Sequence, residues 1–458
     1  MAEHKYLLYT VGVISMATFQ FGYNMAELNE PREAMTCPEA NGPRASGLLP
    51  ECLEMSDWQY GLATSIFAIG GLFGALAAQP IGKRYGRRRT LMLNSVCFIL
   101  AAIVKALAPN VAVLTLGRLL SGLSSGSSAV VVPLYINEIS PRHLRGRYGG
   151  VTQITVNFGI LITQILGLFL SEPSYWRLIL IVGAVVGAFQ AFLLRGIPES
   201  PKYLLGTDKQ AAKEALARLR ATASDAAVKE ELEAMMQPTG VIHTTPEEEP
   251  LTGGHHTRPR AAPVPQVSTW AFLTQRNFRK EAMIVCGLML AQQLTGINAC
   301  ILHGVSILRG LMPSAAGYIN VIISVANLVV TFVASATLFD RVSHKHLLIY
   351  SMSGMATCAF LLSAGIANNI AILSAVALFL FVCSFSFGLG PLPWMVSSKV
   401  VDYEAVDAAQ SSALVFSWFG TFLVAFLVPI IPPVITFIGF GCIGFLSAAI
   451  VWFGVPNY

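Results

Sequence analysis

Long apolar runs alternate with short polar links along almost the whole chain. Each run is long enough to cross the hydrocarbon core of a bilayer as a helix, since that core is about 30 Å thick and needs roughly 20 residues. Six runs lie before residue 196, at 6–28, 58–78, 91–108, 111–136, 149–170 and 176–194, and six after residue 279, at 281–309, 315–339, 347–367, 370–396, 408–430 and 434–453. The pattern predicts an all-α membrane protein with twelve transmembrane helices in two six-helix halves.

The interval between the two sets of runs has a different character. Residues 207–236 are rich in Ala, Glu and Lys, and Ala212, Leu216 and Leu219 recur at helical spacing, which predicts short amphipathic helices. Residues 237–269 are rich in Pro, Thr, Gly and charge without an apolar stripe, which is typical of a disordered linker. We therefore expect an N-terminal half at 1–195, a cytosolic linker at 196–279 and a C-terminal half at 280–458.

A weak internal repeat supports the division into halves. A basic stretch at 83–88 follows the second run, and a weaker copy at 340–345 follows the eighth. The two stretches occupy the same place in their halves, as expected for parallel repeats whose interface encloses a central site.

Composition and charge placement set the orientation. The chain is 54% hydrophobic and 12% charged, whereas soluble domains carry about 25% charged residues. Basic residues crowd the links after the second and fourth runs, which should be cytosolic, whereas the segment 30–57 is mostly acidic and should face outward or into a lumen. The first run is interpreted as a span and not as a cleaved signal. Both termini are then cytosolic, and either the plasma membrane or a vacuolar or other endomembrane is compatible.

Two of the eight cysteines, Cys37 and Cys52, lie in the acidic outer segment. An outward or lumenal location permits a disulfide, so they form either a bridge or two free thiols. The other six fall within the spans and are interpreted as small apolar residues.

Amide side chains concentrate in the seventh run, where Gln292, Gln293 and Asn298 lie within seven residues. An unpaired amide in hydrocarbon costs several kcal/mol, roughly 2–7, so these groups face protein or a water-filled cavity. Amides offer both donors and acceptors and so suit a hydroxylated, uncharged solute. Hydrogen bonds between helices are the alternative, but three amides around Gly296 favour a site. In the fifth run, Gln153 lies on a polar helix face that residues 157 and 164 continue.

Several motifs in the sequence resemble those of the sugar porters of the major facilitator superfamily, which include the facilitative glucose and fructose transporters and fungal sugar transporters. The resemblance covers nearly the whole chain, and it rests on residues 20–24, 85–88, 117–118, 133–141, 145–146, 198–203, 292–298 and 388–394. It implies a sugar site between the halves, made by Gln153, Gln292, Gln293, Asn298 and Trp394. An indole stacks on the apolar face of a pyranose while amides bind its hydroxyls. Trp394 as an interfacial anchor is the alternative.

The resemblance also implies a cytosolic charge network that holds the halves in the outward-facing state. Its members here are Arg87, Arg88, Glu138, Arg145 and Glu199. The matching pattern in the second half is altered, because Lys399 stands where the family has a glutamate.

Proton coupling depends on four further residues. Proton-coupled members have an aspartate at the position of Asn24, close to an arginine that matches Arg118. An amide cannot exchange a proton, which favours simple uniport. Glu27 lies one turn further on, either solvated near the outer mouth or as a coupling group within the span. His303 lies eleven residues after Gln292 and lines the same cavity if the helix is continuous; the alternative is a satisfied hydrogen-bond partner.

These features predict a facilitator that moves a hexose or related polyol by alternating access, as a uniporter. The alternatives are a carrier of a non-sugar metabolite, proton-coupled through Glu27 or His303, and a nutrient sensor that does not transport. We expect no enzyme activity, cofactor, metal site or nucleic-acid partner, because no phosphate-binding loop, metal-ligand spacing or nucleophile elbow is present in the sequence.

Overall fold

A computed structural model describes residues 5–37, 49–141, 148, 150–220, 224–236, 267–338, 341–401 and 405–454. The regular secondary structure of the described residues is helical, and one isolated β-bridge joins Thr36 and Leu53. The N-terminal half contains α1 (Lys5–Ala26), α3 (Asp57–Tyr85), α4 (Arg87–Ala106), α5 (Val111–Ile139), α7 (Val151–Leu170) and α8 (Trp176–Leu193), with the short α2 (Arg32–Met35) after α1.

The C-terminal half begins with two short helices in the seventh span, α13 (Arg279–Leu294) and α14 (Ile297–Arg309). It continues with α15 (Ala316–Thr337), α16 (His344–Ala367), α17 (Ala371–Ser384), α18 (Leu392–Lys399), α19 (Val406–Leu427) and α20 (Pro433–Gly454). Four short helices lie between the halves: α9 (Pro201–Leu204), α10 (Lys209–Leu219), α11 (Asp225–Met236) and α12 (Thr269–Thr274).

Eleven helical segments of the described chain are long and apolar enough to cross a membrane. The first span, α1, is less apolar than these eleven because it contains polar residues such as Thr18, Gln20 and Asn24, which are buried. It packs against α5, α7 and α8 within its half. With α1, the described residues form the twelve spans that the apolar runs predict.

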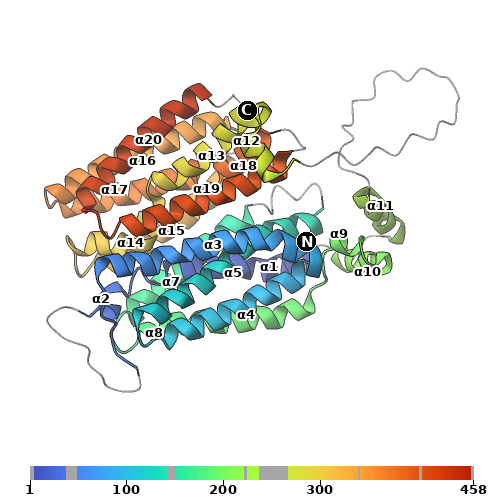
Figure 1. Cartoon of the computed structure of the whole chain (residues 1–458), viewed down its shortest axis with the longest axis horizontal. Helices are drawn as coiled ribbons and strands as arrows, with labels where there is room; N and C mark the ends of the chain where they lie inside the picture. Colours follow the sequence, from blue (N-terminus) through green and yellow to red (C-terminus); the bar gives the residue numbers. More distant parts are fainter. Residues whose placement is uncertain are drawn as a thin grey trace.

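The two halves lie side by side as two bundles, blue to green and yellow to red in Figure 1. We call the end that carries α2 and the bond between Cys37 and Cys52 the disulfide end, and the end that carries α9, α10 and α11 the linker end (Figure 1). The outer cysteine pair is therefore a disulfide.

In the interval between the halves, α10 buries Ala212 and Leu216 against Val228 and Leu232 of α11. Residues 237–266, expected to form a disordered linker, lie outside the described part of the chain.

Backbone contact between α3 and α5 makes the N-terminal half compact. A Cβ atom on Gly74 would lie 1.9 Å from the carbonyl oxygen of Leu123, and one on Gly126 would lie 1.9 Å from that of Gly71. Only glycine permits such an approach, and close backbone packing of small residues stabilises helix pairs in membranes, where the hydrophobic effect does not drive them together.

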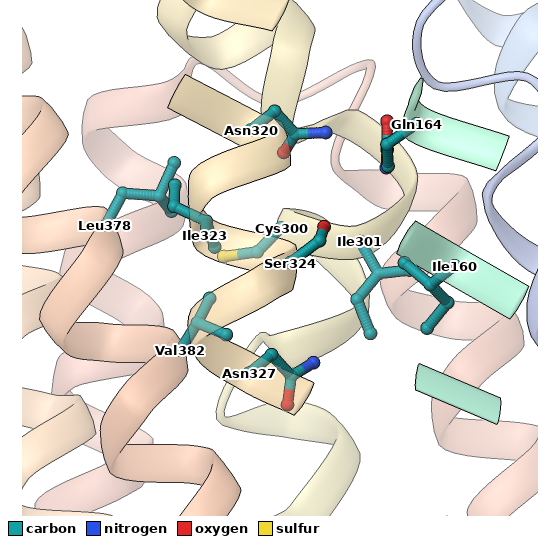
Figure 2. A pocket seen from close by; sticks show the side chains of 10 residues that line it. All are labelled: Ile160, Gln164, Cys300, Ile301, Asn320, Ile323, Ser324, Asn327, Leu378 and Val382. Carbon is teal, nitrogen blue, oxygen red and sulfur yellow. The ribbon is translucent and has the colours of Figure 1, made fainter. Parts of the chain in front are cut away.

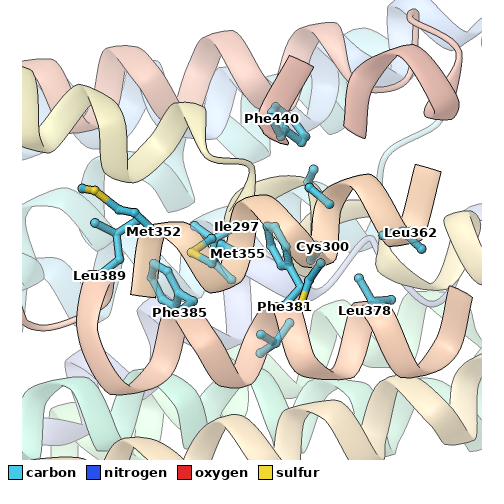
Figure 3. Close-up of a cluster of buried hydrophobic side chains, with 14 of the residues drawn as sticks. Ile297, Cys300, Met352, Met355, Leu362, Leu378, Phe381, Phe385, Leu389 and Phe440 are labelled. Carbon is cyan, nitrogen blue, oxygen red and sulfur yellow. The ribbon is translucent and has the colours of Figure 1, made fainter. Parts of the chain in front are cut away.

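The seventh span is broken at Thr295 and Gly296. Gly296 has φ +97°, a left-handed conformation that costs other residues roughly 1–2 kcal/mol, and a Cβ atom there would lie 2.3 Å from the Phe440 ring. Around the break lies the apolar core of the C-terminal half, formed by Ile297, Cys300, Met352, Met355, Phe381, Phe385 and Phe440 among others (Figure 3). The break therefore fits its surroundings only with glycine.

We expect Gly296→Ala to destabilise the protein by about 2 kcal/mol or more, because both the left-handed backbone and the contact with Phe440 oppose a methyl group. Thermal unfolding in detergent measures the effect. Gly287→Ala is the matched control, since Gly287 is in α13 with no atom within 4 Å of an added Cβ, and it should be neutral or stabilising. Equal melting temperatures for the two variants would contradict the argument.

Candidate functional site

Gln292 lies at the end of α13, opposite an interruption in the tenth span. Residues Phe385–Leu389 form one π-helical turn between α17 and α18, and Pro391 and Pro393 follow. The Leu389 carbonyl loses its α-helical donor because Pro393 has no N–H. The Gln292 side-chain Nε2 donates to this carbonyl at 2.7 Å and to that of Gly390 at 2.8 Å. A side-chain amide of one broken span thus supplies the hydrogen bonds that backbone carbonyls of the other broken span need.

Gln293 and Asn298 continue the amide chain toward α19. The Gln293 Nε2 donates to Gln292 Oε1 at 3.1 Å and to Ser417 Oγ at 2.9 Å. The Asn298 Nδ2 donates to Gln293 Oε1 at 2.6 Å and to Thr421 Oγ1 at 3.1 Å. The break at Gly296 places Asn298 back beside Gln293, and all three amides are buried. The three predicted residues therefore form one connected cluster.

Gln153, the predicted site residue of the N-terminal half, connects to the other half through Asn157. The Gln153 Nε2 donates to Asn157 Oδ1 at 3.2 Å. The Asn157 Nδ2 donates in turn to Asn327 Oδ1 at 3.2 Å and to Thr331 Oγ1 at 3.0 Å, both on α15. Ser386, in the π-helical turn, donates to the same Asn327 oxygen at 2.8 Å. The polar face predicted on the fifth span thus meets α15 of the C-terminal half.

A small cavity of about 20 Å³ lies further along the same interface, toward the disulfide end. Gln164 and Ile160 line it from α7, while Asn320, Ser324 and Asn327 line it from α15 (Figure 2). Gln164 Oε1 and Asn320 Nδ2 are buried without a partner among the described residues. The cavity is about the size of one water molecule, and such a molecule would have polar partners on both sides.

Trp394 is half-buried at the start of α18 and packs on the apolar cluster that contains Phe272, Val285 and Met289. Its carbonyl accepts from Ser397 Oγ at 3.0 Å. Met289 is one turn before the amide cluster on α13, so Trp394 lies on the linker-end side of that cluster. Its stacking on a sugar stays a prediction.

Asn24, Glu27 and Arg118 meet in the N-terminal half together with Lys105. Lys105 Nζ donates to Glu27 Oε1 and to Asn24 Oδ1, the latter at 2.8 Å, and Arg118 Nη1 lies 3.0 Å from Glu27 Oε1. The side chains of Glu27, Lys105 and Arg118 are fully buried. Glu27 is thus enclosed and paired, so the expectation that it lies solvated near the outer mouth is wrong.

Lys105 is a member of this charged cluster that the sequence analysis missed. It lies in the last turn of α4, where a lysine near the end of an apolar run ordinarily extends its ammonium group to the membrane surface. Here its side chain instead points inward beside Gly117, whose missing side chain leaves room for the lysine stem. The available signal was the pair of opposite charges, Glu27 and Lys105, in two spans.

His303 borders a cavity that Gln292, Gln293 and Asn298 do not line. The inference from its spacing assumed one continuous helix, but the break at Gly296 changes the direction of the chain after Gln292. His303 is buried on α14, with its ring centroid 5.8 Å from that of Tyr60 on α3. It borders a second cavity, of about 110 Å³, with Arg32, Ser306 and Thr436.

The predicted charge network lies at the linker end, and its described members are all in contact. Arg87 Nη2 lies 2.8 Å from Glu138 Oε1, and the backbone N–H groups of Arg87 and Arg88 donate to Glu199 Oε1 at 2.8 and 3.0 Å. Ser200 Oγ donates to the other Glu138 oxygen at 2.5 Å. These contacts join α4 and α5 to the residues just before α9, and the role of the network in holding the two halves together stays a prediction. Arg145 and the side chain of Lys399 lie outside the described residues.

Comparison with known proteins identifies relatives of this chain in sequence and in fold. The profile of the sugar (and other) transporter family matches residues 10–458. A probable metabolite transport protein of Saccharomyces cerevisiae is 32% identical over 429 residues, covering 91% of this chain and 85% of that protein. The human facilitated glucose transporter member 4 is 30% identical over 427 residues, covering 89% of this chain and 79% of the human protein. The xylose transporter XylE from E. coli, in a partially occluded inward open conformation, has a TM-score of 0.78 at 20% identity, covering 99% of this chain and 98% of that one.

The chain is a membrane transporter with the twelve-helix fold of the major facilitator superfamily. It belongs to the sugar transporter family and is not an enzyme.

We expect Lys105→Met to destabilise the protein by about 3–5 kcal/mol, because it removes one partner of a buried carboxylate and leaves Asn24 without its donor. Adding Glu27→Gln should recover part of the loss, since the buried negative charge then disappears. Thermal unfolding in detergent measures both. Lys209→Met, at an exposed position on α10, is the control for loss of a lysine charge. A melting temperature for Lys105→Met equal to that of the control would show that the buried pair contributes nothing.

Proposed function

We propose that this protein carries a hexose or a related polyol across its membrane by alternating access, as a facilitated uniporter. The observation that carries the proposal is the buried amide cluster of Gln292, Gln293 and Asn298, which are hydrogen-bonded to one another, to α19 and to the interrupted tenth span. With Gln153 across the interface and Trp394 toward the linker end, these residues are the proposed substrate site.

The chemistry of the cluster favours an uncharged, hydroxylated substrate. Each amide offers donors and an acceptor, and Ser417 and Thr421 add hydroxyl groups that do both. A hydroxyl-rich ligand can take over these hydrogen bonds one for one, so that no buried polar group loses its partner. The related proteins named as glucose transporters point to the same class of substrate.

Uniport is supported by the charges around Asn24. The amide of Asn24 exchanges no proton, and Glu27 is held between Lys105 and Arg118. A proton on Glu27 would leave two adjacent buried cations without an anion, which is costly in an apolar bundle. We therefore assign Glu27, Lys105 and Arg118 a positioning role, in which they hold the end of α1 against α4 and α5.

The proposed orientation places the disulfide end outside the cell or in a lumen, and both termini in the cytosol. Disulfides persist in oxidising compartments, and the basic residues around Arg87 are at the opposite end. The charge network of Arg87, Arg88, Glu138 and Glu199, with Arg145, is then the cytosolic gate.

A non-sugar metabolite is the second candidate substrate. It is favoured by the yeast relative, which is named as a probable metabolite transport protein. Coupling to protons would then pass through Glu27 or His303.

The test is uptake of labelled glucose and fructose by purified protein in liposomes. Gln292→Ala should reduce uptake at low sugar concentration by roughly 10- to 100-fold, because it removes a substrate contact and also leaves the Leu389 carbonyl unpaired. An inward proton gradient should leave wild-type uptake unchanged.

Gln210→Ala, at an exposed position on α10, is the matched control and should transport like the wild type. Uptake driven by the gradient would reject uniport and favour the proton-coupled alternative. Folded protein that transports neither sugar would reject the hexose proposal, and competition by a panel of small metabolites would then identify the substrate.

A further inference from the structure

At the disulfide end, the segment after α1 crosses the interface and contacts α14 of the other half. Arg309 at the end of α14 lies 3.4 Å from Glu30, between Nη2 and Oε1, and 3.0 Å from Glu33, between Nη1 and Oε2. Beside this cluster, the Val305 backbone N–H donates to Asn29 Oδ1 at 3.2 Å. We call Asn29, Glu30, Glu33 and Arg309 the end latch. These contacts hold the two halves together at this end.

Within the end latch, Glu30 is set apart by its burial. Its side chain is 5% exposed, against 67% for Glu33 and 21% for Arg309. A Cβ atom on Gly167 of α7 would lie 2.5 Å from the Glu30 side chain, and one on Gly317 of α15 would lie 2.6 Å from Glu30 Oε1. The two glycines thus leave the space that the carboxyl group fills. Glu30 Oε2 has no hydrogen-bond partner among the described residues.

The charges that face Glu30 do not balance. Arg309 is the cation beside it, and Glu33 is a second carboxylate on the same cation. The neighbouring Arg32 is paired with Asp57 at 2.8 Å, and neither α7 nor α15 contains an acidic or basic residue. With both carboxylates ionised, the end latch carries one excess negative charge.

The pKa of the Glu30 carboxyl is raised from 4.5 to about 7. Burial is the largest cause and raises it, the charge of Arg309 lowers it, and the charge of Glu33 raises it. An unpaired, buried carboxylate oxygen next to an excess negative charge is the environment in which a carboxyl group takes up a proton.

We propose that Glu30 is a proton-binding site that exists only while the disulfide end is closed. The proposal rests on the proposed alternating access, because it requires the two halves to separate at this end. On separation Glu30 leaves Gly167 and Gly317, meets water and releases its proton. A proton on the disulfide side is thus a ligand that favours the closed end, without passing through the substrate site.

The direction of the pH effect follows from the linkage between proton binding at Glu30 and closure of the disulfide end. The pKa of Glu30 is about 7 in the closed form and returns to its ordinary 4.5 in water, so the closed form binds the proton more tightly. Lowering the pH through 7 therefore favours closure. Between pH 8 and pH 5.5 these two values raise the ratio of closed to open forms by about 30-fold.

The experiment measures this ratio directly by electron paramagnetic resonance distances. Spin labels go on Ser174→Cys, between α7 and α8, and Asn368→Cys, after α16, which are exposed at the disulfide end of opposite halves. The six free cysteines are replaced and the disulfide is kept. We expect the short-distance fraction of the otherwise wild-type protein in liposomes to grow from pH 8 to pH 5.5, with a rise in the ratio of about tenfold or more.

Glu30→Gln imitates the protonated carboxyl and should remain closed across the range, with no dependence on pH. Glu172→Gln is the control, because Glu172 is an exposed acid at the same end and is not part of the end latch, and it should respond like the wild type. A wild-type ratio that does not change with pH, or an unchanged response in Glu30→Gln, overturns the proposal. The distances do not depend on sugar uptake, so a failed transport assay with a preserved pH response rejects the substrate and keeps the proton site.

Discussion

The constraint on which this architecture depends is that every polar group inside an apolar bundle needs a partner. The interruption in the tenth span frees the Leu389 carbonyl, and the Gln292 amide from the other broken span satisfies it. The same amide chain continues through Gln293 to Asn298. A substrate that binds at the proposed site would have to replace partners that already exist. Binding and the local shape of the two broken spans are then linked, because a change in the hydrogen-bond partner of the Gln292 amide would leave the Leu389 carbonyl of the tenth span without its donor.

Much of the fold was predictable from the pattern of apolar runs. The boundaries of the spans agree with the helices to within a few residues at most ends, because an apolar run of that length has few alternatives in a bilayer. The concentration of amides in residues 292–298 was also informative, since unpaired amides are costly there. The three residues do form one cluster, although the sequence could not show that Leu389, Ser417 and Thr421 are their partners in this conformation.

Two features were not predictable, for different physical reasons. The position of His303 depends on the left-handed residue Gly296, and a change of direction at one residue cancels an argument from helical periodicity. The burial of Lys105 depends on the empty space at Gly117 on another helix, which is a property of packing and not of the lysine's neighbours in sequence. Likewise, the relation of Asn157 to Asn327 and Thr331 becomes visible only when the two halves are placed together.

The glycine contacts between α3 and α5 have a mechanical consequence. Where backbone touches backbone, as at Gly74 and Leu123, no side chain can change rotamer to absorb movement, so these helices can move only as one solid body. Between the halves the contact is of another kind, since the flat ring of Trp418 on α19 rests against Gly71 on α3. A ring on a smooth glycine surface can slide or lift without breaking a hydrogen bond. The protein thus combines a rigid pair of helices with an apolar contact between the halves that can shift easily. Resistance to relative motion of the halves then comes from the few polar contacts between them.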